Sequence, residues 1–389
     1  MKKILYLFFL LLILVPVSTY ALEINSRNVV LYNLNDDNII YEVNKDERIS
    51  IASMTKIMTT LVALEKIKNP KEKIVMTAPM FYRLVEENAS VAGFYIGEEV
   101  TYEDLLYGLM LPSGADAAQA LAISLYGSVD KFVDRMNEKA KELGLKNTHF
   151  VNPTGLDIKG HYSSVDDVAL ILKEALKNDT FKQVFSANSY ITSNKLHTFY
   201  STRNKYGIDT SFITGSKTGY TLDAGLCLAS TSSYNGIDYL LVTARASSSN
   251  RANHLLDAKT IYKYYQSNYE YRNISKKGDL ITTIKLDDKE ITYYSNLDID
   301  KYLNKKCKIK KKYNGETILD SKKINSNKIG EYIIKCDNDI LYKQDINLVL
   351  NLTEEKNDNF VYLIIISCLS SLVLLLFIIL LIIRWRKKK

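Results

Sequence analysis

Ser53 and Lys56 are the residues whose types and spacing point to chemistry. They lie three residues apart, at the start of an apolar run from Ile57 to Leu64 that has the spacing of a buried helix. On a helix, residues three apart share a face, so the Lys56 amine can reach the Ser53 hydroxyl. A serine with a base beside it is a candidate nucleophile. The spacing therefore predicts covalent catalysis by Ser53.

Lys56 can act as the base only if its pKa is lowered. A free lysine amine has a pKa of about 10.4, which must fall by roughly 2–3 units if the amine is to accept a proton near neutral pH. Burial, the positive end of a helix and a second cation all lower a lysine pKa. The pattern alone is not specific, because Ser128 and Lys131 share the spacing in a polar stretch. Other motifs in the chain must decide whether Ser53 and Lys56 are a catalytic pair or a chance match of the spacing.

Ser113 provides a second hydroxyl in a setting that suits proton transfer. It follows Leu111-Pro112 on a short loop between two helical patterns, 102–110 and 117–125. A serine on a tight loop between two apolar helices is expected to face inward, where it can relay a proton. The alternative is a serine that simply caps the second helix.

Lys217 is a candidate for the second cation. It lies in the run Ser216-Lys217-Thr218-Gly219, ahead of a strand pattern over 225–232 that Asn235-Gly236 turns back into a second strand over 237–245. The missing side chain of Gly219 leaves room for an extended substrate to add to the strand edge through backbone hydrogen bonds. The alternative is an exposed lysine at a strand start.

The order of these three motifs resembles a known family. S-x-x-K, then a serine loop, then K-T-G is the set shared by penicillin-binding proteins and class A β-lactamases. Over residues 23–350 the chain is similar to the D-alanyl-D-alanine carboxypeptidases among the low-molecular-mass penicillin-binding proteins, peptidase family S11. The resemblance implies an α+β fold, with a β-lactamase/transpeptidase-like domain of antiparallel sheet flanked by helices and then a small all-β domain. It implies no cofactor.

The resemblance also implies roles for the catalytic side chains. Ser53 would attack the carbonyl between the two terminal D-alanines of a peptidoglycan stem pentapeptide, and Lys56 would take the hydroxyl proton. Ser113 would relay a proton to the departing D-alanine. Lys217 would hold this relay and lower the pKa of Lys56. β-Lactam antibiotics would acylate the same serine.

Substrate-binding roles follow in the same way. The backbone N–H groups of Ser53 and Tyr220 would form the oxyanion hole. Thr218 and Arg245 would bind the terminal carboxylate, the arginine as a bidentate partner. The sequence departs from the family at Ala115, where members usually carry an asparagine whose amide binds the substrate backbone. Either neighbouring Asp116 or another group compensates, or turnover is reduced.

Both ends of the chain have the composition of membrane-targeting segments. Residues 1–21 read as a secretory signal peptide. Residues 361–383 are uncharged and almost wholly apolar, and the basic residues that follow favour a single-pass membrane protein with an extracellular catalytic domain and a cytoplasmic tail. The expected parts are a signal peptide 1–21, a serine peptidase domain 22–268, a β-rich domain 269–350, a linker 351–360, a transmembrane helix 361–383 and a basic tail 384–389.

Composition excludes several other classes of protein. Five of the positive charges behind the net charge of +7 lie in the tail, and without a basic stripe bearing interleaved aromatics we expect no nucleic-acid partner. The histidines show no metal-ligand spacing, so no metal site is expected. Lysines gather between 305 and 312, which indicates a solvated strand face or, as the lesser alternative, contact with an anionic wall or membrane. Cys307 and Cys336 are a possible pair that the sequence does not decide.

Three other functions suit the same motifs. A β-lactamase would need a Glu-x-x-Leu-Asn loop, and the nearest segment, Glu174–Asn178, does not match it. A transpeptidase would form the same acyl-enzyme and pass it to an amine. A non-catalytic cell-wall scaffold would keep the fold without turnover, and Ala115 is the single feature that favours it.

Overall fold

The computed structural model describes residues 22–324 and 326–348, which divide into two units between Ser267 and Asn268. Each unit is considered by itself. The predicted signal peptide 1–21, the linker 351–360, the transmembrane helix 361–383 and the basic tail lie outside the described residues. Within the described ranges, none of the helices combines the length and the hydropathy that a membrane span requires.

The first unit is built on a five-stranded antiparallel sheet in the order β2-β1-β9-β8-β7. Strand residues alternate between its two faces. In β9, Leu240 and Val242 belong to the core shared with the helices, whereas Tyr239 contacts the ring of Tyr262 on the other face. The strands are β1 (Asn28–Asn33), β2 (Asn38–Val43), β7 (Gly215–Thr221), β8 (Gly225–Tyr234) and β9 (Ile237–Ala246).

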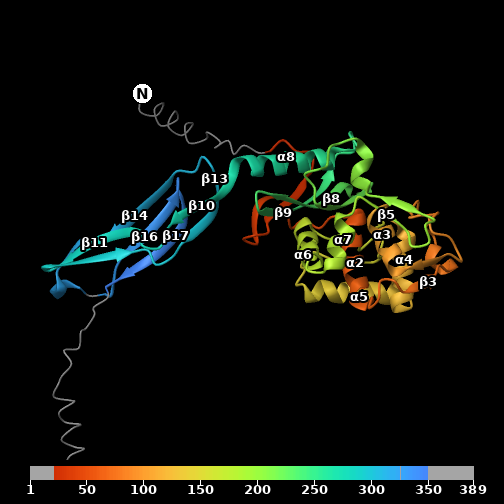
Figure 1. Ribbon diagram of the computed structural model, residues 1–389, viewed down its shortest axis with the longest axis horizontal. Helices are drawn as coiled ribbons and strands as arrows, with labels where there is room; N and C mark the ends of the chain where they lie inside the picture. The colour runs from red at the N-terminus through yellow and green to blue at the C-terminus, as the bar shows by residue number, and fades with distance from the viewer. Residues whose placement is uncertain (1–21, 325, 349–389) are drawn as a thin grey trace, which may run out of the picture. The chain divides into compact units, whose positions relative to one another are not determined.

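Helices cover both faces of this sheet (Figure 1). One face carries α6 and α7 together with the rest of a helical layer, and α8 packs on the opposite face. The layer closes a single core around the buried helix α2. The helices are α2 (Thr55–Lys66), α3 (Tyr102–Met110), α4 (Ala115–Tyr126), α5 (Val129–Glu142), α6 (Val165–Ala175), α7 (Asp179–Ser186) and α8 (Asn253–Asn268).

Side-chain caps fix where several of these helices begin. Thr101 and Asp104 form a reciprocal capping box at the start of α3, and such boxes satisfy backbone N–H groups that the first turn leaves unpaired. Ser128, Ser164 and Asn178 each accept a backbone N–H at the starts of α5, α6 and α7. These caps fix the starts of the helices that pack around α2, the helix that carries Lys56.

Short elements fill the remainder of the first unit. Two small hairpins, β3 (Lys73–Val75) with β4 (Glu99–Thr101) and β5 (Ser189–Ile191) with β6 (Thr198–Tyr200), lie outside the main sheet. The sequence indicates a turn into a strand where β4 begins, but β5 and β6 were not predicted, because three-residue strands give too little alternation to stand out. The 3₁₀ turns are η1 (Ala52–Met54), η2 (Ala78–Phe81) and η3 (Thr202–Tyr206).

The second unit consists almost wholly of strands, in sheets ordered β10-β13, β12-β11-β15 and β14-β16-β17. Asn314-Gly315 has the composition of a hairpin turn, but both residues pair with β16 as part of β14. The ring of Tyr313 occupies the space that side chains at Gly315 and Gly330 would fill. The strands are β10 (Tyr269–Ser275), β11 (Leu280–Leu286), β12 (Lys289–Tyr294), β13 (Ile299–Asn304), β14 (Ile309–Gly315), β15 (Ile318–Leu319), β16 (Lys328–Cys336) and β17 (Asp339–Asn347), and the turn η4 (Ser321–Lys323) lies between β15 and β16.

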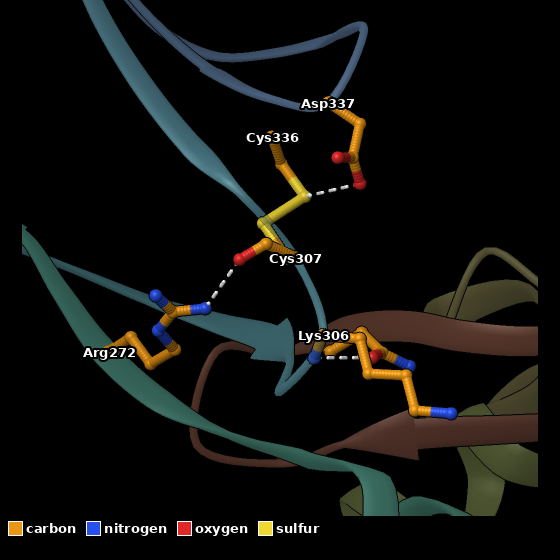
Figure 2. The surroundings of a disulfide bond; sticks show 6 residues. Arg272, Lys306, Cys307, Cys336 and Asp337 are labelled. Atoms are coloured by element: carbon orange, nitrogen blue, oxygen red, sulfur yellow. Dashed lines mark hydrogen bonds between the residues drawn. A yellow bond between two sulfur atoms is a disulfide. The ribbon is translucent and has the colours of Figure 1, made fainter.

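A disulfide joins Cys307 to Cys336, a pairing that the sequence left open. The bond ties the residue two before β14 to the last residue of β16, and both cysteines pack in or against the core of this unit. Figure 2 shows that Arg272 approaches the same place, where its Nη1 donates to the Cys307 carbonyl at 2.8 Å. The covalent link therefore closes one end of the β14-β16-β17 sheet.

Candidate active site

Ser53 and Lys56 are brought together by the junction of η1 and α2. The Lys56 Nζ lies 3.1 Å from the Ser53 Oγ, one turn along the helix as the spacing requires. The amine is buried, and it also donates to the carbonyl of Thr154 at 2.5 Å. It is therefore held by two oxygens, one of which is the candidate nucleophile.

Burial changes the acidity of the Lys56 amine. Removal from water lowers its pKa to about 7, and the nearby carboxylate of Asp116 opposes this shift. From the sequence we expected Lys217 to share in lowering the pKa of Lys56. In the structure burial is the largest cause, and the like charges of Lys56 and Lys217 also interact, which disfavours charging both amines at once. A substantial fraction of Lys56 is therefore neutral near pH 7 and able to accept a proton.

This pKa predicts how acylation depends on pH. Only the neutral amine can take the Ser53 proton, so the rate of acylation by a penicillin should rise with pH through a midpoint near 7. At one pH unit below the midpoint about a tenth of the limiting rate is expected. Stopped-flow measurement of the second-order rate constant between about pH 5.5 and 9 checks this. A flat profile across that range would mean that Lys56 is not the base.

Ser113 and Lys217 form a second hydrogen-bonded pair. The Lys217 Nζ donates to the Ser113 Oγ and to the Thr218 carbonyl, each at 2.9 Å. Both side chains are buried. Burial, then the charge of Lys56, hold the pKa of Lys217 well below its usual range. The interaction between the two amines shows that the two pairs share one electrostatic environment.

Strand β7 lies directly against the candidate nucleophile. A Cβ atom at Gly219 would be 3.0 Å from the backbone N of Ser53 and 3.1 Å from the Cβ of Ala52. This spacing is tighter than ordinary contact, so glycine lets the strand approach η1 closely. Because β7 is also the edge strand of the sheet, its outer edge is open to backbone pairing with an added strand beside Ser53.

The loop 152–158 forms another wall of the site. Gly155 has φ +83°, and a Cβ there would be 2.0 Å from the Ala52 carbonyl oxygen. This position therefore requires glycine both for its conformation and for space. The Thr154 carbonyl of this loop holds Lys56, and residues of the loop line a cavity at Ser53.

A cavity of about 870 Å³ opens at Ser53. Its wall combines the nucleophile pair, the start of α4, the loop 152–158, the end of β7 and the segment 82–90. The residues that line the cavity include Ser53, Lys56, Ala115, Gln119, Asn152 and Tyr220. Ser113 and Lys217 are buried behind this surface.

Asp116 does not replace the amide that Ala115 lacks. Its buried carboxylate accepts N–H groups from Ala92 at 2.8 Å, Gly93 at 3.0 Å and Phe94 at 3.3 Å, and so fixes the segment that leads to the cavity wall. An amide does lie one helical turn after Ala115, on the side chain of Gln119, which lines the same cavity.

Arg245 lies elsewhere than predicted. Its Nη1 donates to the Glu47 Oε1 at 2.5 Å, and the residue lines a separate cavity of about 570 Å³ together with Arg48, Lys159 and Tyr162. The structure therefore does not place Arg245 at Ser53. Its position depends on how β9 ends and on Glu47, which is 198 residues away in sequence, so no local pattern could reveal it.

Thr218 has a partner that the sequence did not indicate. Its hydroxyl lies 2.6 Å from that of Thr202 in η3, and the backbone N–H of Thr202 donates to the Leu111 carbonyl. Thr202 thus connects β7 to the loop that carries Ser113. A threonine in a polar loop gives no signal of such a role in a single sequence.

Known proteins share both the sequence and the fold. A family model described as D-alanyl-D-alanine carboxypeptidase, Peptidase_S11, matches residues 16–248. The D-alanyl-D-alanine carboxypeptidase DacF of Bacillus subtilis is 35% identical over 284 residues, which are 69% of each chain. The DacA enzyme of Escherichia coli is 37% identical over 215 residues, and the chain spans about half of its length.

Solved structures agree with this assignment. The Streptomyces K15 DD-transpeptidase has a TM-score of 0.57 and 32% identity, covering 62% of this chain and 97% of its own. Penicillin-binding protein 5 of Haemophilus influenzae covers 85% of this chain and 98% of its own, with a TM-score of 0.64 and 24% identity, and shows a shared fold. These matches agree with a site that combines a serine, two lysines and an edge strand. The chain belongs to the D-alanyl-D-alanine carboxypeptidase family, peptidase S11.

Proposed function

We propose that this enzyme removes the terminal D-alanine from peptidoglycan stem pentapeptides through an acyl-enzyme on Ser53. The observation that carries the proposal is the 3.1 Å contact between the Ser53 hydroxyl and a buried Lys56 amine whose pKa is about 7. The Ser53 oxygen bonds to the carbonyl carbon of the penultimate D-alanine, its proton passes to Lys56, and the C–N bond to the last residue breaks.

The remaining residues have supporting roles in this proposal. Ser113, held by Lys217, passes a proton to the departing amine. The backbone N–H groups of Ser53 and Tyr220 stabilise the oxyanion, and the substrate backbone pairs with the edge of β7 at Gly219. Thr218 binds the terminal carboxylate. Arg245 would bind the same carboxylate only after its ion pair with Glu47 opened. Water then releases the shortened peptide.

A transpeptidase is the second candidate, because a solved relative at 32% identity is named a DD-transpeptidase. Both reactions form the same acyl-enzyme and differ in the acceptor. The test is to incubate the enzyme with a stem pentapeptide, with and without an amine acceptor, and to quantify free D-alanine, tetrapeptide and cross-linked product. Carboxypeptidase activity yields tetrapeptide and D-alanine in equal amounts. A dominant cross-linked product would assign the transpeptidase instead.

Two further measurements test for a β-lactamase and for a non-catalytic scaffold. Mass spectrometry of the penicillin-treated protein should find the adduct on the peptide that contains Ser53. Rapid and sustained hydrolysis of nitrocefin would favour a β-lactamase. The absence of both adduct and D-alanine release would favour a scaffold.

We propose that the enzyme works outside the cell, anchored by a helix over residues 361–383. The apolar run and the basic tail of the sequence support this topology. The Cys307–Cys336 disulfide supports it independently, because disulfides form and persist in oxidising compartments. Labelling of the tail and of the peptidase unit with a membrane-impermeant reagent on intact cells would test it.

A further inference from the structure

The second unit carries a set of lysines on the outward side of one sheet. Residues of β14 and β16 alternate in direction, and Tyr332 and Ile334 point into the core. Lys310 and Lys312 alternate along β14 with the two residues that pair with Tyr332 and Ile334, so they face away from the core. Lys335 of β16 is directly opposite Lys310. We call Lys310, Lys312 and Lys335 the lysine face.

The lysine face has no counter-charge within the described residues. None of its three amines forms an ion pair there, although Lys311, on the other side of β14, bonds to Asp279 at 2.8 Å. Glu331 lies on the same face, diagonal to Lys312, but its carboxylate pairs with Lys328 and Lys343. Asp337 and Asp339, at the turn between β16 and β17, form no ion pair with the lysine face. The positive charge of the face is therefore left for solvent or for a partner.

Two other lysines of the same sheet provide a contrast. Lys328 bonds to Glu331 at 2.7 Å and to Asp345 at 2.8 Å, and Lys343 bonds to Glu331 at 2.8 Å. Lys343 lies in the same cross-strand row as Lys312, because both are opposite Ile333. Paired lysines therefore lie beside the three unpaired ones.

Protection of the sheet edge does not account for this arrangement. Lysines on an edge strand discourage pairing with other chains, which would explain Lys310 and Lys312 on β14. Lys335 is on the central strand β16 of the sheet, where an edge needs no protection. Like charges directly opposite each other destabilise a sheet, so the pair of Lys310 with Lys335 costs stability and suggests a function that offsets it.

We propose that the lysine face binds a linear anionic polymer of phosphodiesters, a polyol phosphate chain. Two residues along a strand advance about 6.8 Å, so Lys310 and Lys312 form a row of amines along the strand, and Lys335 widens it. A row matches a chain whose charge repeats along its length.

The test uses the full chain in neutral detergent and synthetic poly(glycerol phosphate), with affinity measured by calorimetry at about 20 and 300 mM salt. The variant Lys310→Gln/Lys312→Gln/Lys335→Gln should lose about tenfold in affinity at low salt, and the loss should shrink at high salt. The matched control Lys328→Gln/Lys343→Gln should change affinity by no more than about twofold, since those amines are already paired. Lys335→Gln alone should also raise the melting temperature of the free protein.

Several results would overturn the proposal. One is the absence of polymer binding by the wild type. Another is an equal loss of affinity in the control variant, which would mean that net charge alone explains the effect. A third is an unchanged melting temperature in Lys335→Gln. A parallel titration with phosphatidylglycerol vesicles distinguishes the other source of phosphate. If the triple variant loses vesicle binding and keeps polymer binding, the face contacts the membrane and the proposal is wrong.

Discussion

Acylation by benzylpenicillin is expected to slow by about 10²- to 10⁴-fold in Lys56→Ala, the usual contribution of a positioned general base. The variant keeps the Ser53 hydroxyl and removes the amine 3.1 Å from it. It also leaves the Thr154 carbonyl without its donor, which costs about 1–3 kcal/mol if that oxygen stays buried. Quench-flow measurement of the acylation rate constant, with thermal unfolding of the same sample, separates the chemical effect from misfolding.

Two control variants accompany this measurement. Ser53→Ala should form no adduct at all and sets the background. Lys66→Ala, at the exposed end of the same helix, should acylate at the wild-type rate, because its amine is outside the cavity. A Lys56→Ala enzyme that acylates within tenfold of the wild type would require another base.

The variant Gly155→Ala is expected to be the most damaging change of a single methyl group. The residue has φ +83°, where a non-glycine residue costs about 1–2 kcal/mol. The new Cβ would also meet the Ala52 carbonyl oxygen at 2.0 Å, and such overpacking costs about 1–3 kcal/mol more. The loop must retreat and carry Thr154 away from Lys56. We expect unfolding to require about 2–5 kcal/mol less, with at least a tenfold loss in acylation rate.

Gly160→Ala is the matched control for this prediction. It lies in the same part of the chain at φ +91°, but a Cβ there would meet nothing nearer than the Val151 Cγ2 at 3.7 Å. It should therefore show the conformational cost alone and keep normal acylation. Urea unfolding monitored by fluorescence, combined with penicillin labelling, compares the two variants. Equal losses in both would show that contact with Ala52 is unimportant.

Local patterns in the sequence located most of the elements that carry the site. Helix α3 has the bounds that periodicity predicts, because one buried face imposes a repeat of 3.6 residues. The three motifs also placed Ser53, Lys56 and Lys217 on elements that meet, and the comparisons with relatives support the same family. Family resemblance supplied the substrate, which spacing could not.

The parts that the sequence did not predict depend on distant partners or on backbone atoms. The Thr154 carbonyl that holds Lys56 belongs to no side-chain pattern. Arg245 was expected to bind a carboxylate of the substrate, yet its guanidinium bonds to Glu47, and nothing near either residue signals that contact. Burial, one of the causes expected from the sequence, is the largest cause of the low Lys56 pKa, but its extent is a property of the whole fold that no local pattern gives.

The bond between Cys307 and Cys336 limits where this protein can be made. It closes the end of the β14-β16-β17 sheet at which Lys310 and Lys335 repel each other. In the reduced chain no covalent bond opposes that repulsion. Thiols stay reduced in an ordinary bacterial cytosol. Formation of the disulfide therefore needs an oxidant, and recombinant production should be directed to the periplasm or to an oxidising host strain.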